Sequence, residues 1–393
     1  MHSLSTNPLE EFALSLKERE QQQALRQTSS VRPAGAGLIE MNGKKLVNLA
    51  SNDYLGLSQD SRLVQRSIEY TQRYGAGSGA SRLLGGNLDV YEKLESKIAE
   101  LKGTETALIL ATGFQTNSSV IPALLNEKSI AAADRLVHRS MIEGLLLSKS
   151  RWFRYQHNNL LDLQERMSRF HAGERSARWI LTESVFSMDG DTIDLPALVK
   201  IAESSNSFLF IDEAHATGVL GENGMGMTAG KKFPGISMGT FGKGLGSFGA
   251  YVACSKLMRD YLINFCPGFI YSTGLPPSVL GAIDAALDLV ADLNEERAQL
   301  QEKAADLRNA IAKSGFETGS SSTQIIPVIV GPSSSALNLS EYLESCGFYV
   351  PAIRPPTVPE GSARLRISLS SVHSKEQLQS FLEALRRWNE QSS

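Results

Sequence analysis

Residues 239–247 read GTFGKGLGS and place Lys243 between two glycines. A lysine in such a setting either binds a phosphate group or uses its amine as a nucleophile. A phosphate-binding P-loop requires G-x-x-x-x-G-K followed by Ser or Thr. Ser237 stands at the position of the first glycine and Gly244 follows the lysine, so the segment does not match a P-loop. The pattern favours an amine that reacts covalently, on a turn whose backbone a bulky planar partner can approach.

An acid and a histidine precede this lysine in the apolar segment FLFIDEAH, at residues 208–215. Asp212 ends the apolar run, and His215 follows three residues later. A carboxylate at the end of a buried strand is costly unless it is paired. A pyridinium nitrogen would pair with it, and the carboxylate would keep that ring protonated. A carboxylate for a ring nitrogen and a lysine for an aldehyde together predict pyridoxal 5'-phosphate as the cofactor.

The phosphate of such a cofactor needs hydrogen-bond donors. Gly113 and Phe114 follow an apolar run and precede a helix-length segment, and free amides at the start of a helix bind phosphate. The hydroxyl groups of Thr240 and Ser187 could add further donors. Each feature alone is commonly a turn or a helix cap, but their occurrence together at strand ends favours cofactor contacts.

Strand-like runs alternate with helix-length stretches in the middle of the chain, which predicts an α/β domain with a largely parallel sheet. Ligands of such sheets bind at the carboxyl ends of the strands. The predicted strands are 107–112, 178–184, 208–214 and 249–255.

The two ends of the chain have different patterns. Residues 1–50 predict an amphipathic helix and a hairpin that turns at Asn42 and Gly43. Residues 278–313 predict one long connecting helix, and a smaller α+β domain follows. Its predicted strands are 324–331, 347–353 and 363–370, and its predicted helix is 374–390. The expected domains are therefore 1–50, 51–280 and 281–393.

The composition of the 393 residues excludes several classes of protein. A net charge of −3 and a hydrophobic content of 42% are typical of a soluble globular protein without a nucleic-acid-binding surface. No apolar run approaches the roughly 18 residues that span a membrane, and the N-terminus does not resemble a secretory signal, so we expect a cytoplasmic protein without membrane partners. Neither the six histidines nor the three cysteines have metal-ligand spacing, and Cys254, Cys266 and Cys346 are expected to be buried.

A second possible cofactor motif is GAGSGA at 75–80, which satisfies the bare G-x-G-x-x-A pattern of dinucleotide-binding proteins. That pattern has meaning only after a buried strand. The preceding residues, 61–74, form a polar helical pattern, which argues against a nicotinamide-dependent dehydrogenase.

Six motifs along nearly the whole chain resemble the α-oxoamine synthases. These are fold-type-I pyridoxal-phosphate-dependent transferases with an aspartate-aminotransferase-like fold. The resemblance implies a large domain with a mostly parallel sheet and a smaller α+β C-terminal domain. The motifs are NDYLGL (52–57), GAGSGASRLLGG (75–86), TESVFSMDGD (182–191), DEAHATGVLGENGMG (212–226), TFGKG (240–244) and IRPPTVPEGSARLRISLS (353–370).

The resemblance implies catalytic roles for Lys243, Asp212 and His138. Lys243 would hold the cofactor covalently and act as a base, Asp212 would contact the ring nitrogen, and His138 would stack on the ring and contact the substrate. Without the family, a histidine such as His138 would more often be structural. The further cofactor contacts implied are Gly113, Phe114, Ser187, His215 (to the phenolic oxygen) and Thr240, with Ser272 and Thr273 reaching the phosphate of a neighbouring subunit. The last pair implies a homodimer with shared active sites.

The resemblance also implies a set of substrate-binding residues. Arg366 is the better candidate for the amino-acid carboxylate, because a guanidinium binds a carboxylate through two hydrogen bonds. Without the family, an arginine on a C-terminal strand would mostly be solvated. The implied substrate contacts are Arg26, Asn52, His138, Arg354, Thr357 and Arg366.

The motif TFGKG and the proline-rich segment IRPPTVPEG resemble those of the family branch that serves biotin biosynthesis. This implies condensation of L-alanine with a pimeloyl thioester, carried by coenzyme A or a carrier protein, with loss of carbon dioxide. A sister enzyme that uses glycine with an acetyl or succinyl thioester would share all the cofactor residues. A catalytically silent subunit of the kind some relatives carry would lack the lysine, which is present here as Lys243.

Overall fold

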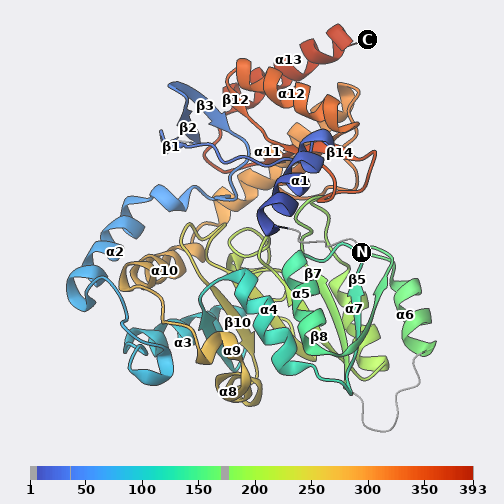
Figure 1. Cartoon of the computed structure of the whole chain (residues 1–393). Coiled ribbons are helices and arrows are strands. Elements are labelled where there is room, and N and C mark those ends of the chain that lie inside the picture. The colour runs from blue at the N-terminus through green and yellow to red at the C-terminus, as the bar shows by residue number, and fades with distance from the viewer. Residues whose placement is uncertain (1–6, 36, 170–176, 393) are drawn as a thin grey trace. The chain divides into compact units, whose positions relative to one another are not determined.

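The computed structural model describes residues 7–35, 37–169 and 177–392, and the chain divides into two compact units (Figure 1). Unit 1 consists of Met1–Ser51, Lys303–Ser321 and Ile325–Ser393, and unit 2 of Asn52–Glu302 and Ser322–Gln324. The domains expected from the sequence are consecutive segments, whereas each compact unit combines segments that are distant in the sequence.

Unit 2 contains a seven-stranded sheet with the strand order β4-β10-β9-β8-β7-β5-β6. β10 pairs antiparallel with both β4 and β9, and the other pairs are parallel. All strands except β10 therefore run the same way, and their carboxyl ends lie at one edge of the sheet. The strands are β4 (Thr106–Leu110), β5 (Ile130–Asp134), β6 (Arg151–Tyr155), β7 (Arg178–Glu183), β8 (Ser207–Asp212), β9 (Gly235–Thr240) and β10 (Ala250–Cys254).

Helices cover both faces of this sheet. Successive residues of each strand point to opposite faces, so each strand contributes to two separate cores. Leu181 and Phe210 pack with residues of α4, α5 and α8 on one face. Ile180 and Leu209 pack with residues of α6 and α7 on the other. Figure 1 shows α4, α5 and α7 beside the labelled strands. The helices of unit 2 are α2 (Ser61–Tyr74), α3 (Val90–Lys102), α4 (Gly113–Leu124), α5 (Arg139–Ser148), α6 (Leu160–Arg169), α7 (Leu195–Ser204), α8 (Lys256–Phe265), α9 (Pro267–Ile270) and α10 (Pro277–Val290), with short 3-10 helices at Leu57–Gln59, Arg82–Leu84 and Glu222–Gly224.

The four strands expected from the sequence form β4, β7, β8 and β10, and the prediction of a largely parallel sheet is confirmed. The prediction of one continuous helix over 278–313 is wrong. α10 ends at Val290 and α11 (Asn294–Lys313) begins after a turn. The guanidinium of Arg297 donates hydrogen bonds to the Val290 carbonyl and to Asn294, so it satisfies the end of α10 and stabilises the break. Residues 75–80 follow α2 and not a strand, which removes the context for dinucleotide binding.

Unit 1 joins the first residues of the chain to the last ones. Its hairpin turns at Asn42 and Gly43, whose φ values of 51° and 75° fit a type I′ turn and confirm the prediction. β3 of this hairpin pairs in parallel with β12, about three hundred residues later. The first sheet contains β1 (Arg32–Pro33), β2 (Leu38–Met41), β3 (Lys44–Asn48) and β12 (Phe348–Tyr349), the second contains β11 (Ile325–Gly331), β14 (Ala363–Ser368) and β13 (Ala352–Ile353), and the helices are α1 (Pro8–Gln21), α12 (Ser333–Ser345) and α13 (Lys375–Ser392).

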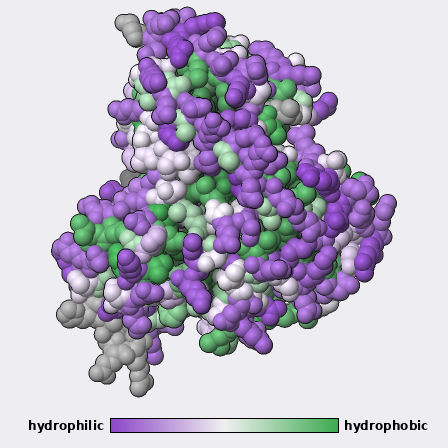
Figure 2. Space-filling model, turned by 180° about the vertical axis from the view of Figure 1, so that it is seen from behind, coloured by the Kyte–Doolittle hydropathy of each residue, from purple (hydrophilic) through white to green (hydrophobic). Residues whose placement is uncertain are grey.

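Helix α1 is present as predicted, but none of its residues is buried. Cys254 and Cys266 are buried, whereas Cys346 is exposed just after α12, so the expectation of burial is wrong for that cysteine. Among the described residues, no helix is long and apolar enough to cross a membrane, and no group of His, Cys, Asp and Glu side chains could hold a metal ion. On the face drawn in Figure 2, hydrophilic residues predominate and hydrophobic ones form separate groups.

Candidate active site

Lys243 lies in the loop after β9, at the edge of the sheet where the parallel strands end. Its Nζ is 2.7 Å from His215 Nε2, and His215 Nδ1 is 2.6 Å from the hydroxyl of Tyr54. That hydroxyl donates to Asn52 Oδ1 at 3.1 Å. The lysine amine therefore begins a hydrogen-bonded chain that includes His215 and Asn52, both of which were predicted from the sequence.

The glycine after the lysine allows a close approach of two loops. A Cβ at Gly244 would lie 2.6 Å from the carbonyl oxygen of Thr217 and 3.2 Å from Cα of Gly218, which is too close for any side chain. With glycine at this position, the Lys243 loop packs directly on the turn that follows His215. Gly244 thus lets the amine of Lys243 lie against the imidazole of His215, which gives a structural reason for the glycine after the lysine.

Asp212 ends β8 and is almost fully buried. Its Oδ2 accepts a hydrogen bond from the amide of Asn117 at 2.7 Å, and its Oδ1 accepts one from the Ala214 N–H at 2.8 Å. The neighbouring strand places Glu183 in register with Asp212. Burial and the charge of Asp212 raise the pKa of Glu183 well above its usual range. Asp212, in contrast, keeps two donors that stabilise a carboxylate suited to a pyridinium nitrogen.

Glu213, the residue after Asp212, connects this strand end to α3. Glu213 forms a fully buried ion pair with Lys102 at the end of α3. The lysine also donates to the Met225 carbonyl at 2.9 Å and to the Thr228 hydroxyl at 2.6 Å. Thr228 in turn donates its N–H to Glu213 Oε1 at 3.0 Å. The segment 212–215 is thus fixed to α3 through a closed polar cluster.

His138 precedes α5 and caps it through its ring, since Nδ1 accepts from the Ser140 N–H at 3.3 Å. The Ser140 hydroxyl is 2.7 Å from the same nitrogen. The ring of Phe114 meets the imidazole edge-on, with 6.4 Å between centroids. Partial burial and the charge of Lys243 lower the pKa of His138, and Asp212 opposes them. His138 is therefore a neutral imidazole that keeps a solvent-accessible edge beside the two charged residues.

The start of α4 has the free N–H groups that the predicted phosphate site requires. The Thr112 side chain caps the helix by accepting from the Gln115 N–H at 3.1 Å, and the N–H groups of Gly113 and Phe114 belong to the first turn, which a helix cannot satisfy internally. A Cβ at Gly113 would be in van der Waals contact with Thr240, at 3.9 Å, so the start of α4 lies beside the end of β9. The donors, the acid and the amine fit a phosphorylated pyridine aldehyde.

Three further predicted cofactor contacts lie in loops of unit 2. Ser187 is half-buried after β7, in a loop closed by a hydrogen bond from Gly190 N–H to the Phe186 carbonyl at 2.9 Å. Ser272 accepts a hydrogen bond from the Gln115 side chain at 2.5 Å, and Thr273 forms an isolated bridge with Ser81. Ser272 therefore lies near the start of α4 within the same chain.

Four predicted substrate residues belong to unit 1. Arg26 donates to the Thr357 hydroxyl at 3.0 Å, and Arg354 donates to the Gln23 carbonyl. Arg366 is buried on β14 and donates to the Ser368 hydroxyl at 2.6 Å. The structure brings Arg26 and Thr357 together but does not relate these four residues to Lys243.

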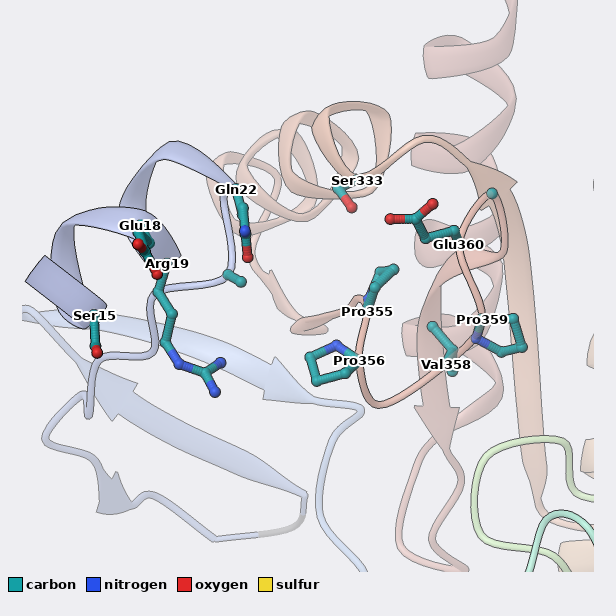
Figure 3. A pocket seen from close by; sticks show the side chains of 12 residues that line it. Ser15, Glu18, Arg19, Gln22, Ser333, Pro355, Pro356, Val358, Pro359 and Glu360 are labelled. Carbon is teal, nitrogen blue, oxygen red and sulfur yellow. The ribbon is translucent and has the colours of Figure 1, made fainter.

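A cavity of about 840 Å³ lies beside these segments of unit 1 (Figure 3). α1 supplies Arg19 to one wall, and the loop before β14 supplies the rings of Pro355 and Pro356 and the carboxylate of Glu360. Figure 3 shows the Arg19 side chain extending from α1 on the side of Pro356. The cavity thus combines apolar walls with charged groups of both signs.

Several residues at the edge of the unit 2 sheet were not predicted from the sequence. Tyr54 belongs to the NDYLGL motif and Glu183 to TESVFSMDGD, so the motifs are the sequence signal that marks both residues. Asn117, Ser140 and Lys102 carry no sequence signal of their own, because amides, hydroxyls and lysines are common on helices.

The family model for class I and II aminotransferases matches residues 44–385. The chain belongs to the class I and II aminotransferase family. The "Putative 8-amino-7-oxononanoate synthase" of Paramagnetospirillum magneticum is 51% identical over 360 residues, which cover 90% of this chain and 91% of that protein. The 8-amino-7-oxononanoate synthase of Gluconacetobacter diazotrophicus is 46% identical over 381 residues, which cover 95% and 96%. These relatives confirm the resemblance to the α-oxoamine synthases.

Solved structures give the same result for the fold. The 8-amino-7-oxononanoate synthase of Francisella tularensis matches with a TM-score of 0.76 and 28% identity, covering 88% of this chain and 98% of that one. A variant of serine palmitoyltransferase from S. paucimobilis with bound PLP–myriocin aldimine matches with a TM-score of 0.92 and 24% identity, covering 98% and 99%. The fold is that of the fold-type-I transferases, as predicted, and the protein is an enzyme whose cofactor is pyridoxal 5'-phosphate.

Proposed function

We propose that this enzyme condenses L-alanine with a pimeloyl thioester, with loss of carbon dioxide, to give 8-amino-7-oxononanoate for biotin biosynthesis. The observation that carries the proposal is the position of the Lys243 amine, hydrogen-bonded to His215 at the sheet edge where Asp212 ends β8. The names of the relatives support the choice of substrates.

Bound pyridoxal phosphate supplies an aldehyde that condenses with amines and a ring that stabilises negative charge at the substrate Cα. Asp212 would hold the ring nitrogen, and its buried hydrogen bonds from Asn117 and Ala214 keep its charge in place. Gly113, Phe114 and Thr240 would hold the phosphate at the start of α4. His215 would contact the phenolic oxygen of the ring, Ser187 would be a further cofactor contact, and His138 would lie on the ring face.

The chain's own residues would then act in a fixed order. Lys243 removes the proton from Cα of alanine, a general-base role worth about 10² to 10⁴ in rate. Cα forms a bond to the pimeloyl carbonyl carbon, the carbon–sulfur bond breaks, and the sulfur leaves as the thiolate. His138 donates a hydrogen bond to the ketone oxygen while the carboxylate leaves as carbon dioxide. Lys243 finally returns a proton to Cα, so atoms and charge balance.

Unit 1 offers candidates for substrate recognition. Arg366 would bind the carboxylate of alanine through two hydrogen bonds. The cavity beside α1, with its proline walls and the nearby Arg26, Arg354 and Thr357, is a candidate for the acyl thioester. Asn52 would contact substrate from the chain that begins at Lys243.

A homodimer with shared sites belongs to the same proposal, as does a cytoplasmic location. Ser272 and Thr273 would reach the phosphate bound by a second copy. The neighbouring Tyr271 is 83% exposed and Leu84, close to the Ser81–Thr273 bridge, is 82% exposed. Large apolar side chains left in water next to this pair support the idea of a covering subunit.

The proposal is tested by measuring product formation from alanine or glycine with pimeloyl-, acetyl- or succinyl-coenzyme A, and with a pimeloyl carrier protein. We expect turnover with alanine and a pimeloyl thioester. A clear preference for glycine with a short acyl group would instead identify a sister α-oxoamine synthase, which the same cofactor residues would serve.

The role of Lys243 is tested by Lys243→Ala, which should abolish turnover and the visible absorption of the lysine-bound cofactor while circular dichroism shows an intact fold. Retained turnover would refute the assignment.

A further inference from the structure

A buried polar chain connects Asp212 to His138 through two residues that the proposed reaction does not use. The side-chain nitrogen of Asn117 donates to Asp212 Oδ2 at 2.7 Å and to the Ser140 hydroxyl at 2.9 Å. The Ser140 hydroxyl lies 2.7 Å from His138 Nδ1. Asn117 is 1% exposed and Ser140 is fully buried, and they come from the adjacent helices α4 and α5.

The partners in this chain determine where each proton lies. The carboxylate of Asp212 can only accept, so the NH₂ group of Asn117 must face it. The second N–H of that group donates to the Ser140 oxygen, which leaves the hydroxyl proton of Ser140 free to point at His138 Nδ1. The backbone N–H of Ser140 also points at Nδ1, at 3.3 Å, and a backbone N–H can only donate. Nδ1 is therefore an acceptor, and the proton of the neutral ring is on Nε2.

We propose that Asn117 and Ser140 are positioning residues that hold His138 as its Nε2-protonated tautomer and thereby give the reaction a fixed N–H donor. This rests on the proposed function, in which His138 donates to the ketone oxygen of the substrate. The other tautomer would present a lone pair at Nε2 and would repel that oxygen.

The charged surroundings of His138 agree with this arrangement. Its backbone N–H donates to Glu183, and the charged groups that act on its ring are Asp212 and Lys243. The ring of Phe114 covers one side by an edge contact. Asp212 attracts a proton to the imidazole and Lys243 repels it, so charge alone does not choose a nitrogen. The directional bonds from Ser140 make that choice.

The proton position can be measured directly on the full-length enzyme with its cofactor. Nitrogen NMR of histidine-labelled protein distinguishes a protonated ring nitrogen from an unprotonated one, and the His138 signals are assigned from their loss in His138→Gln. We expect Nε2 alone to be protonated in the wild type. In Ser140→Ala the 2.7 Å hydroxyl contact is lost and only the longer backbone N–H contact of 3.3 Å remains, so we expect a mixture of both tautomers. Ser148→Ala is the matched control, because Ser148 is buried on the same helix and bonds to the Leu145 carbonyl and Ser150, away from His138.

Asn117→Asp gives a second test that needs no cavity. The new carboxyl would lie against the carboxylate of Asp212, so it would stay protonated and donate to Asp212, because two adjacent carboxylates do not both ionise. Its other oxygen would accept the hydroxyl proton of Ser140, so Nδ1 would lose its stronger donor. We expect a mixture of both His138 tautomers in this variant and the wild-type tautomer in Ser140→Thr, which keeps the hydroxyl.

Kinetics separate a positioning role from a merely structural one. Ser140→Ala should reduce kcat by about 10- to 100-fold with an unchanged KM for alanine, because a misplaced donor affects the reacting state and not binding. A single Nε2-protonated form in Ser140→Ala, or a mixture of tautomers with wild-type kcat, would overturn the inference. If the wild type fails to use alanine and a pimeloyl thioester, the proposed function fails, while the NMR result still decides the proton position.

Discussion

Replacement of Lys102 by methionine tests whether the polar cluster under Asp212 stabilises the site. The change keeps the length and apolar volume of the side chain but removes its charge. It leaves the carboxylate of Glu213, which is fully buried, without its cationic partner. Breaking a buried ion pair from one side costs about 3–5 kcal/mol. Because Thr228 still donates its N–H and hydroxyl to Glu213, we expect the lower end, about 3 kcal/mol.

The effect is measured by thermal unfolding of the wild type and Lys102→Met, followed by far-ultraviolet circular dichroism. A loss of about 3 kcal/mol in a unit of this size lowers the melting temperature by roughly 6–12 °C. The matched control is Lys93→Met on the same helix. Lys93 is 60% exposed and reaches Asp284 at 3.3 Å, so its loss should cost no more than about 1 kcal/mol.

The double variant Lys102→Met/Glu213→Gln removes both charges and should recover most of the lost stability, since an amide in place of the carboxylate carries no unpaired charge. Because Glu213 follows Asp212 directly, the single variant should also bind pyridoxal phosphate more weakly than the double one. If the single variant melts within 2 °C or so of the wild type, or the double variant is the less stable of the two, the cluster does not stabilise this strand end in the way described.

Three further predictions concern single groups. Asp212→Asn should weaken cofactor binding and slow the exchange of the alanine Cα proton with solvent, and exchange at the wild-type rate would contradict the role of the carboxylate. Burial would lower the pKa of His157, but Asp134 and Asp191 raise it to about 10, so its stabilising effect is complete below about pH 6.5 and is lost as pH rises through about 10. The difference in unfolding free energy between wild type and His157→Gln should therefore shrink over that range, and a constant difference would argue against a charged ring. Burial lowers the pKa of His373 to about 4. The stabilising effect of its neutral ring is therefore present above about pH 6.5 and is lost as pH falls through about 4. The unfolding free energies of the wild type and His373→Asn, measured over a pH series, should converge over that range.

The sequence predicted those parts of the fold that have strong local signals. Asn42 and Gly43 require positive φ values and gave the hairpin, and long apolar runs gave β4, β7 and β8. β5 was missed because its sequence, IAAAD, is rich in alanine, which favours helices. β9 was missed because its sequence, GISMGT, has glycine at its first and fifth positions, which weakens a strand pattern. The break between α10 and α11 depends on a side chain seven residues beyond the carbonyl it caps, which periodicity does not reveal.

The candidate site divides in the same way. Asp212 and Lys243 could be predicted because each follows a strand and has a chemical partner that explains it. Asn117 and Ser140 could not, because their role arises only when α4 and α5 pack against each other. The contacts that define it join residues 95 and 23 positions apart. Composition and spacing carry no trace of such a contact.

The two histidines of the site hold their protons on opposite nitrogens, and the reason is the kind of partner that each one has. An ammonium group can only donate, so a charged Lys243 requires a lone pair at His215 Nε2, and the Nδ1 proton then points at Tyr54. His138 is the reverse, with a lone pair at Nδ1 and a proton at Nε2. One imidazole can therefore accept a hydrogen bond from the lysine, while the other can give a hydrogen bond to a substrate oxygen. Two side chains of the same kind thus keep different roles, because their fixed neighbours decide which nitrogen is protonated.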